Sequence, residues 1–208
     1  MKAIRLIALA ACMAATLDAS AQEQEIRLFS HRGGRMEHDE NTLSAFQASY
    51  DAGYRGFETD IRMTRDGALV ITHDSSLERT TDGTGTVEEK TEAEIRQLAT
   101  KQGNKMMFLD ELLEFLEGKE GLYVEFEMKT HPAALYPEER LDAYCDKLYD
   151  AVMAVKPADA TFVFTSGDYR GLRYLQAKHP GVDLLLITSK PCNDETIDLC
   201  KAMGRSEE

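Results

Sequence analysis

Residues 56–63 of the chain read Gly-Phe-Glu-Thr-Asp-Ile-Arg-Met, and charged and apolar side chains alternate along them. Residues two apart on a β-strand face the same way, so Glu58 and Asp60 point together. Residues 57, 59 and 61 alternate with them, are mostly apolar and suit packing against helices. The stretch therefore predicts a strand with one carboxylate face and one core face.

Residues 122–129 repeat this pattern further along the chain. Glu125, Glu127 and Lys129 share one face of the expected strand, and the residues between them are apolar. Carboxylates turned into a protein interior are costly unless something neutralises them. A divalent cation does so, and Ca²⁺ and Mg²⁺ both prefer oxygen ligands.

Short apolar runs alternate with helical patterns over the rest of the chain. Strands are expected at residues 26–31, 56–63, 69–73, 122–129, 161–165 and 182–188. Helices are expected at residues 42–53, 92–98, 109–116, 137–155, 169–178 and 195–203. This alternation predicts a mostly parallel sheet with crossover helices, either an open doubly wound sheet or a (β/α)8 barrel. No Gly-x-Gly-x-x-Gly turn follows the first strand, which disfavours a dinucleotide-binding sheet.

Polar residues gather where the expected strands end, which is the rim that carries the active site in an α/β barrel. His31 and Arg32 end the first strand, His73 ends the third, and Ser166 follows the fifth. Together with Lys129 and a carboxylate-bound metal, these residues suit phosphoryl chemistry. The cations stabilise charge on the phosphate oxygens, while one histidine accepts a proton and the other donates one.

Five motifs, taken in order, resemble the glycerophosphodiester phosphodiesterase family, a group of barrel enzymes. They are His31-Arg32-Gly33 with Glu40-Asn41-Thr42, Glu58-Thr59-Asp60, His73-Asp74, the loop at residues 77–85, and Glu127-Met128-Lys129. Each motif alone has little specificity, but all five lie at an expected strand end or in the adjoining loop. The resemblance covers the chain from Phe29 to Ser166.

This resemblance implies a role for the residues that match the motifs. His31 and His73 resemble the general acid/base pair of the family. Arg32 and Lys129 resemble its phosphate-binding cations. The implied fold is the (β/α)8 barrel, which settles the choice between the two architectures in favour of the barrel.

The metal ligands implied by the resemblance are Glu58, Asp60 and Glu127, and the expected cofactor is a divalent metal, with Ca²⁺ favoured over Mg²⁺. Glu125 is a further candidate, either as a metal ligand or for binding a substrate group. Ser166 is a candidate for hydrogen bonding the phosphate or, equally, for capping the following helix.

The implied reaction cleaves a glycerophosphodiester, such as glycerophosphocholine or glycerophosphoethanolamine, into an alcohol and sn-glycerol 3-phosphate. The expected partner is this small-molecule substrate, and the oligomeric state is left open. Two other hypotheses stay open: a related phosphodiesterase that acts on another lipid headgroup, and an inactive or binding-only remnant of the barrel. The remnant hypothesis arises because six strands are expected, two fewer than a closed eight-stranded barrel has.

The chain has 208 residues, of which 37 are acidic and 24 basic, giving a net charge of −13. Such a chain repels nucleic acid and anionic membrane surfaces, because both require a basic footprint. A hydrophobic content of 43% is enough to build one domain. We therefore expect a single barrel domain at residues 22–208 that lacks its last two strands.

The beginning of the chain has the pattern of a secretory signal. A basic start precedes an apolar run, and Ala19-Ser20-Ala21 matches the small-x-small site of signal peptidase. We expect a signal peptide at residues 1–21, too short for a transmembrane helix, and a periplasmic or secreted protein. The alternative is a lipoprotein anchored through Cys12, because residues 9–12 resemble a lipobox.

The chain has four cysteines, which are too few for a disulfide scaffold. Cys192 and Cys200 are eight residues apart, and two alternatives are open for them. They pair in an oxidising compartment, or they remain as partly buried thiols.

Overall fold

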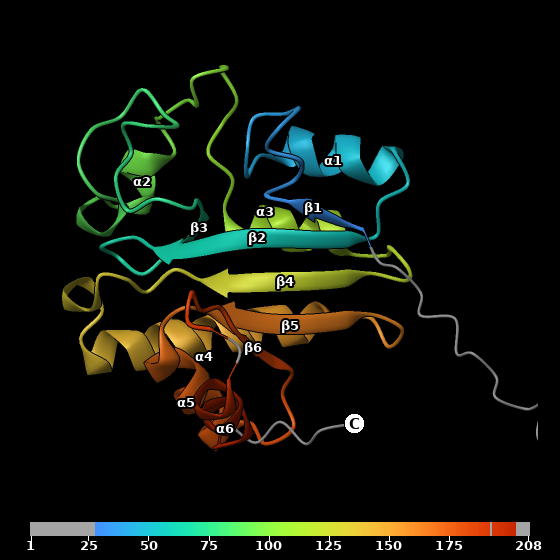
Figure 1. The fold of residues 1–208 in the computed structure, drawn as a ribbon. Coiled ribbons are helices and arrows are strands. Elements are labelled where there is room, and N and C mark those ends of the chain that lie inside the picture. Colours follow the sequence, from blue (N-terminus) through green and yellow to red (C-terminus); the bar gives the residue numbers. More distant parts are fainter. Residues whose placement is uncertain (1–27, 192, 203–208) are drawn as a thin grey trace, which may run out of the picture.

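The computed structural model describes residues 28–191 and 193–202. Their sheet has the strand order β1-β2-β4-β5-β6, and these neighbours run parallel. The strands are β1 (Phe29–His31), β2 (Gly56–Met63), β4 (Tyr123–Met128), β5 (Thr161–Ser166) and β6 (Leu184–Leu186). Parallel strands need long crossover connections, and each connection here contains at least one helix (Figure 1).

The parallel strands follow one another across the sheet in chain order. A doubly wound sheet instead reverses its strand order at a switch point and carries helices on both faces. Over β2 and β4, the face turned to the viewer in Figure 1 carries no helix, whereas α3 and α4 lie behind the sheet. The fold is therefore a partial (β/α)8 barrel, and the doubly wound alternative is excluded.

The third strand corrects one part of the expectation. β3 (Leu69–Ile71) pairs with the end of β2 in antiparallel register, Ile61 standing opposite Ile71. The six expected barrel strands are therefore five parallel strands and one antiparallel strand within the described ranges. The intervening turn brings β3 back along β2, so that the amide of Thr72 donates to the carbonyl of Asp60 at 2.9 Å. The β2–β3 hairpin, and not a parallel barrel strand, therefore places His73 beside the strand ends.

Side-chain caps mark the start of the first two α-helices. The side chain of Thr42 accepts a hydrogen bond from the amide of Ala45 at the start of α1, and Thr91 and Glu94 form a capping box at the start of α2. The α-helices are α1 (Leu43–Asp51), α2 (Glu92–Ile95), α3 (Leu109–Leu116), α4 (Glu138–Val155), α5 (Tyr169–Lys178) and α6 (Asp194–Ala202). Two short 3-10 helices are η1 (Val87–Glu89) and η2 (Ala133–Leu135).

The main hydrophobic core lies between the sheet and the helices α1, α3, α4 and α5. Phe57 of β2 and Phe126 of β4 are fully buried. The ring of Phe57 packs against Phe46 of α1 and Phe115 of α3, with centroids 5.8 and 6.3 Å away. The apolar face predicted for residues 56–63 therefore packs against the helices, and its carboxylate face is left for the other side of the sheet.

Several expectations concern residues that lie outside the described ranges. They are the signal peptide at residues 1–21, the lipobox cysteine Cys12, and Cys192 of the Cys192–Cys200 pair, and they stay predictions. Among the described residues, no helix combines the length and the apolar character needed to span a bilayer.

The core predicts a sharp contrast between two positions of α4. Leu148 is fully buried, whereas Met153 on the same helix is 37% exposed. We expect Leu148→Ala to lower the free energy of unfolding by about 2–5 kcal/mol, because it removes buried apolar surface and leaves a cavity. The matched variant Met153→Ala should change the free energy by less than about 1 kcal/mol. Urea unfolding followed by circular dichroism measures both, and equal losses would contradict this account of the core.

Candidate active site

The end of β1 turns sharply toward the neighbouring strand. Arg32 and Gly33 both adopt left-handed conformations, with φ of 54° and 74°. Glycine does this freely, and a Cβ at Gly33 would lie only 3.0 Å from the side chain of Ala45. An arginine in this conformation costs about 1–2 kcal/mol. Backbone hydrogen bonds hold it there, from the Arg32 amide to the Glu58 carbonyl at 3.0 Å and from the Asn41 amide to the Arg32 carbonyl at 2.9 Å.

Three carboxylates from β2 and β4 meet at one point. Asp60 stands opposite Glu127 in the register of the two strands, and Glu58 lies two residues before Asp60. One carboxylate oxygen from each residue lies within 4.8 Å of the other two. Oε1 of Glu58 and Oδ1 of Asp60 are buried without a hydrogen-bond partner. Unpartnered oxygens of this kind fit a divalent cation, so Glu58, Asp60 and Glu127 could hold a metal ion.

The crowding of negative charge changes the protonation of these groups. Burial raises the pKa of Glu58 to about 8, and the charges of Asp60 and Glu127 add to the effect. The amide of Arg32 donates to Oε2 of Glu58 at 3.1 Å, and together with the charge of Arg32 it opposes the rise. Burial likewise raises the pKa of Glu125. A bound cation would favour the ionised form of these carboxylates.

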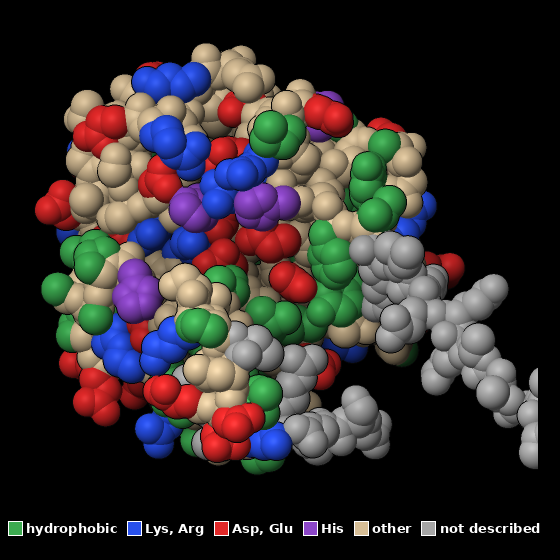
Figure 2. All heavy atoms as spheres, in the orientation of Figure 1, with side chains coloured by type: hydrophobic (Ala, Val, Ile, Leu, Met, Phe, Trp, Pro, Cys, Tyr) green, Lys and Arg blue, Asp and Glu red, His purple; other side chains and the backbone are tan. Residues whose placement is uncertain are grey.

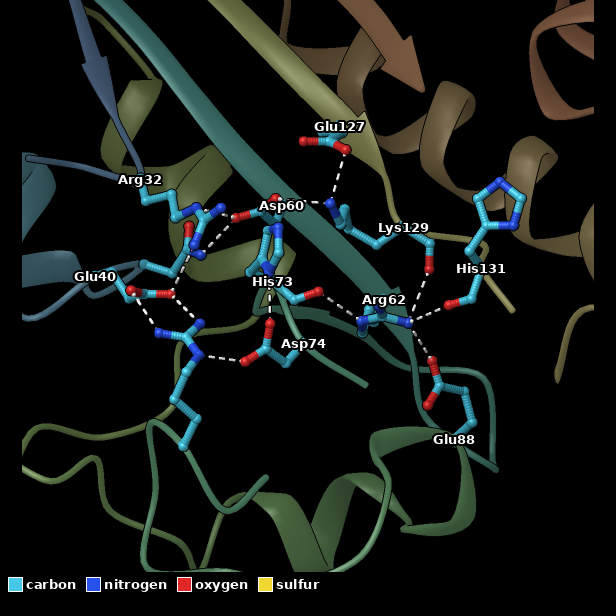
Figure 3. Close-up of polar contacts among 12 residues, drawn as sticks. Arg32, Glu40, Asp60, Arg62, His73, Asp74, Glu88, Glu127, Lys129 and His131 are labelled. Atoms are coloured by element: carbon cyan, nitrogen blue, oxygen red, sulfur yellow. Dashed lines mark hydrogen bonds and ion pairs between the residues drawn. The ribbon is translucent and has the colours of Figure 1, made fainter. Parts of the chain in front are cut away.

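Two basic side chains reach the carboxylates from opposite sides, as Figure 3 shows. Nε of Arg32 lies 3.2 Å from Oδ2 of Asp60. Nζ of Lys129 lies 2.8 Å from Oε1 of Glu127 and 3.7 Å from Oδ1 of Asp60. Asn41 adds a neutral donor, because its side-chain amide bonds Oδ2 of Asp60 at 2.9 Å. The expected phosphate-binding cations therefore flank the expected metal ligands.

His31 lies at the mouth of this cluster, with Nε2 3.5 Å from Oε2 of Glu58. Burial lowers its pKa, and the positive charges of Arg32 and Arg35 lower it further. These effects favour the neutral imidazole of His31, which is able to accept a proton.

His73 approaches the cluster from β3, and its Nδ1 lies 2.6 Å from Oδ1 of Asp74. Burial disfavours the ionised form of Asp74, but hydrogen bonds from Arg79 and His73 outweigh it and lower the pKa of Asp74 to about 2. An ionised carboxylate only accepts hydrogen bonds, so Nδ1 of His73 carries a proton and donates it to Asp74. This leaves Nε2 of His73 free to exchange a proton with a substrate.

The loop at residues 77–85 ties the two histidine-bearing segments together. Arg79 donates to both oxygens of Glu40, at 2.7 and 3.0 Å, and also pairs with Asp74. Glu40 in turn accepts from Arg32 at 3.2 Å. The sequence motifs contain Glu40, Asp74 and Arg79, but no role was predicted for them. The available signal was their opposite charges in the loops that follow β1 and β3.

Glu125 and Ser166 are placed differently from the other candidates. Glu125 stands opposite Glu58 on the same face of the sheet, but its oxygens are not among the three that converge. The hydroxyl of Ser166 is buried, donates to the carbonyl of Met128 at 2.8 Å and accepts from the amide of Asp168 at 2.9 Å. The side chain of Asp168, and not that of Ser166, caps α5. Ser166 thus joins the ends of β4 and β5.

Figure 2 shows acidic, basic and histidine side chains gathered on the helix-free face of the sheet. The fold and the site together define a class of protein: a parallel α/β barrel scaffold with carboxylates, two histidines and two cations grouped at its strand ends. This class suits metal-assisted chemistry on a phosphate ester.

Comparison with known proteins places the chain in a family. The sequence model of the Glycerophosphoryl diester phosphodiesterase family matches residues 31–206. The chain therefore belongs to the glycerophosphoryl diester phosphodiesterase family, as the five motifs indicate.

Relatives of known name agree with this assignment. The chain is 36% identical over 123 residues to a glycerophosphodiester phosphodiesterase of Caldanaerobacter subterraneus, which is 55% of this chain and 50% of that protein. It therefore spans about half the length of this curated relative.

Solved structures show the same fold. A glycerophosphodiester phosphodiesterase from Agrobacterium tumefaciens is 27% identical with a TM-score of 0.62, covering 76% of this chain and 65% of that one. A phosphodiesterase from Oleispira antarctica, solved in complex with the product sn-glycerol-3-phosphate, has a TM-score of 0.74 at 24% identity. That match covers 86% of this chain and 72% of the Oleispira chain.

The raised pKa of Glu58 predicts a pH dependence for the metal-free protein. Its folded-state pKa of about 8 lies above the ordinary value of 4.5. The folded state therefore binds this proton more tightly than the unfolded state, and the resulting stability is lost as the pH rises through about 8. Between these two pKa values the free energy of unfolding falls by up to about 1.4 kcal/mol per pH unit.

The difference between the wild type and Glu58→Gln isolates this effect, because the amide does not titrate. In the presence of EDTA, we expect wild-type stability, relative to the variant, to fall from pH 5 to pH 8 in urea unfolding. Parallel curves for the two proteins over this range would contradict the pKa shift.

Proposed function

We propose that the protein is a metal-dependent glycerophosphodiester phosphodiesterase. Its substrates would be glycerophosphodiesters such as glycerophosphocholine or glycerophosphoethanolamine, and its products an alcohol and sn-glycerol 3-phosphate. The observation that carries the proposal is the convergence of Glu58, Asp60 and Glu127 within 4.8 Å, with Arg32 and Lys129 beside them. Family membership and the curated names of the relatives support the same activity.

The protein's own residues supply binding and proton transfer. Arg32 and Lys129 are held at opposite sides of the carboxylates, where their positive charges attract the phosphate of a diester. Charge grows on the non-bridging oxygens during displacement, and fixed cations stabilise it without reorganisation. His31, whose neutral form is favoured, accepts a proton from the attacking hydroxyl or water. His73, when protonated at both ring nitrogens, donates its Nε2 proton to the oxygen of the leaving alcohol.

Glu58, Asp60 and Glu127 would hold the divalent cation, and Ca²⁺ is favoured over Mg²⁺. Calcium takes six to eight oxygen ligands in flexible geometry, whereas Mg²⁺ usually binds one or two carboxylates and keeps several waters. When bound, the cation supplies Lewis-acid stabilisation of the phosphate charge.

The two histidines give a direct test of activity. With glycerophosphocholine and calcium, we expect His31→Ala and His73→Ala each to lower kcat by about 10²–10⁴-fold, the usual contribution of general acid/base catalysis. His38→Ala is the matched control, because His38 is exposed in the loop that follows His31 and should leave kcat unchanged. Release of choline, followed by an enzyme-coupled assay, measures all three variants. A wild-type chain that binds calcium but releases no choline would support the binding-only hypothesis instead.

Calcium binding is tested separately from catalysis by thermal unfolding. A ligand that binds only the folded state raises the midpoint, by the equivalent of about 2.7 kcal/mol at one hundred times its Kd. We expect calcium to raise the wild-type midpoint, EDTA to reverse the rise, and Glu127→Gln to reduce it strongly. Glu114→Gln, on the outer helix α3, is the control and should respond to calcium like the wild type. An unshifted wild-type midpoint would contradict the metal site.

The proposal includes export of the protein to the periplasm or the medium through the signal pattern at residues 1–21. A lipoprotein anchored through Cys12 is the alternative. Mass spectrometry of the mature protein distinguishes them, because cleavage after Ala21 leaves an unmodified Gln22 and the lipoprotein route leaves a lipidated Cys12.

A further inference from the structure

Arg62 is a buried arginine on the strand that carries two of the carboxylates. It lies two residues beyond Asp60 on β2 and forms an ion pair with Glu88 of η1, with 2.8 Å between Nη1 and Oε1. The side chains of Arg62 and Glu88 are only 6% and 3% exposed. Neither residue has a hydrogen bond or ion pair with the side chains of the site residues described above, so the proposed chemistry gives this pair no role.

The guanidinium of Arg62 holds the backbone of two segments that carry site residues (Figure 3). Its Nε donates to the carbonyl of His73 at 2.9 Å. Its Nη1 donates to the carbonyls of Lys129 and His131 at 3.0 and 3.1 Å. One rigid planar group therefore fixes the backbone at the proposed acid/base residue and at the proposed phosphate-binding cation.

Glu88 is held just as firmly from its other side. Its Oε1 accepts from the hydroxyl of Tyr136 at 3.0 Å, and its Oε2 accepts from the hydroxyl of Ser75 at 2.7 Å. The Tyr136 hydroxyl in turn accepts from the amide of Met63 at 3.0 Å. Ser75 lies two residues after His73, so Glu88 reaches the same segment that Arg62 holds. Full hydrogen bonding of this kind is what makes a buried ion pair tolerable.

We propose that Arg62 and Glu88 form a positioning pair that sets the placement of His73 relative to Lys129. This inference rests on the proposed function. A simple ion pair between β2 and η1 would require none of the three carbonyl contacts. Lysine cannot replace the arginine, because an ammonium lacks the planar fork that reaches several acceptors in fixed directions.

Arg140 of α4 provides a matched control within the same protein. It is also partly buried and donates from Nη2 to two carbonyls near the end of β2, those of Met63 and Thr64, each at 2.9 Å. These carbonyls belong to residues outside the candidate site. Arg140→Lys therefore removes two carbonyl contacts and a contact with the ring of Tyr136, but it does not touch the segments of His73 or Lys129.

The first measurement compares the kinetics of Arg62→Lys, Glu88→Gln and Arg140→Lys. With calcium and glycerophosphocholine, we expect the first two to lower kcat by about 10²-fold, as a misplacement near 1 Å does. Arg140→Lys should stay within about threefold of the wild type. The calcium-dependent rise of the thermal midpoint should persist in all three variants, because the β2–β4 ladder holds the carboxylates. Equal kinetic losses in Arg62→Lys and Arg140→Lys would overturn the proposal.

The second measurement, amide hydrogen exchange, does not depend on activity. We expect faster exchange in Arg62→Lys at residues 72–77 and 128–131, with the rest of the sheet unchanged, and no such increase in Arg140→Lys. Uniformly faster exchange throughout Arg62→Lys, or no change in either segment, would overturn the positioning role. If the wild type shows no hydrolysis, the proposed function fails, and the exchange pattern alone decides whether the pair positions these two segments.

Discussion

The repulsion among three carboxylates on one face of two neighbouring strands shapes the rest of the site. Glu58, Asp60 and Glu127 are brought together by the parallel register of β2 and β4, where their charges cannot separate. Burial and mutual repulsion raise the pKa of Glu58, and the surrounding groups act against that repulsion. Arg32, Lys129 and Asn41 each donate toward a carboxylate, and the unpartnered oxygens leave room for a cation.

The backbone around the carboxylates places the groups that offset their repulsion. Arg32 reaches Asp60 only because the chain turns through two left-handed residues at the end of β1, and Gly33 makes the second of these possible. The antiparallel hairpin of β3 likewise returns the chain to the level of Asp60, which places His73 beside the cluster. Strand pairing thus brings together residues that are far apart in the sequence, and local turns direct their side chains toward the carboxylates.

Two sets of charged side chains link the loops around the site. Arg79 joins Glu40 and Asp74, which connects the segment after β1 to His73 on the exposed side. Arg62 and Glu88 connect His73 to the segment after β4 on the buried side. His73 is consequently held from both directions, by its ring through Asp74 and by its backbone through Arg62. Such support holds the imidazole of His73 within the narrow geometry that its proposed proton transfer needs.

Much of the fold and of the site could be predicted from local sequence patterns. The ranges of β2, α3 and α5 match the expected ones, because residues 56–63, 109–116 and 169–178 each have a clear two-residue or helical period. The five motifs likewise identified the seven residues that the structure brings together at the strand ends, since strand periodicity and short strand-end motifs are local properties. The direction of β3, the use of Ser166 to join β4 and β5, and the role of Arg62 were decided by tertiary structure alone. A three-residue apolar strand has the same pattern in either direction, and the partner of a hydroxyl or a buried guanidinium depends on which distant segments pack beside it.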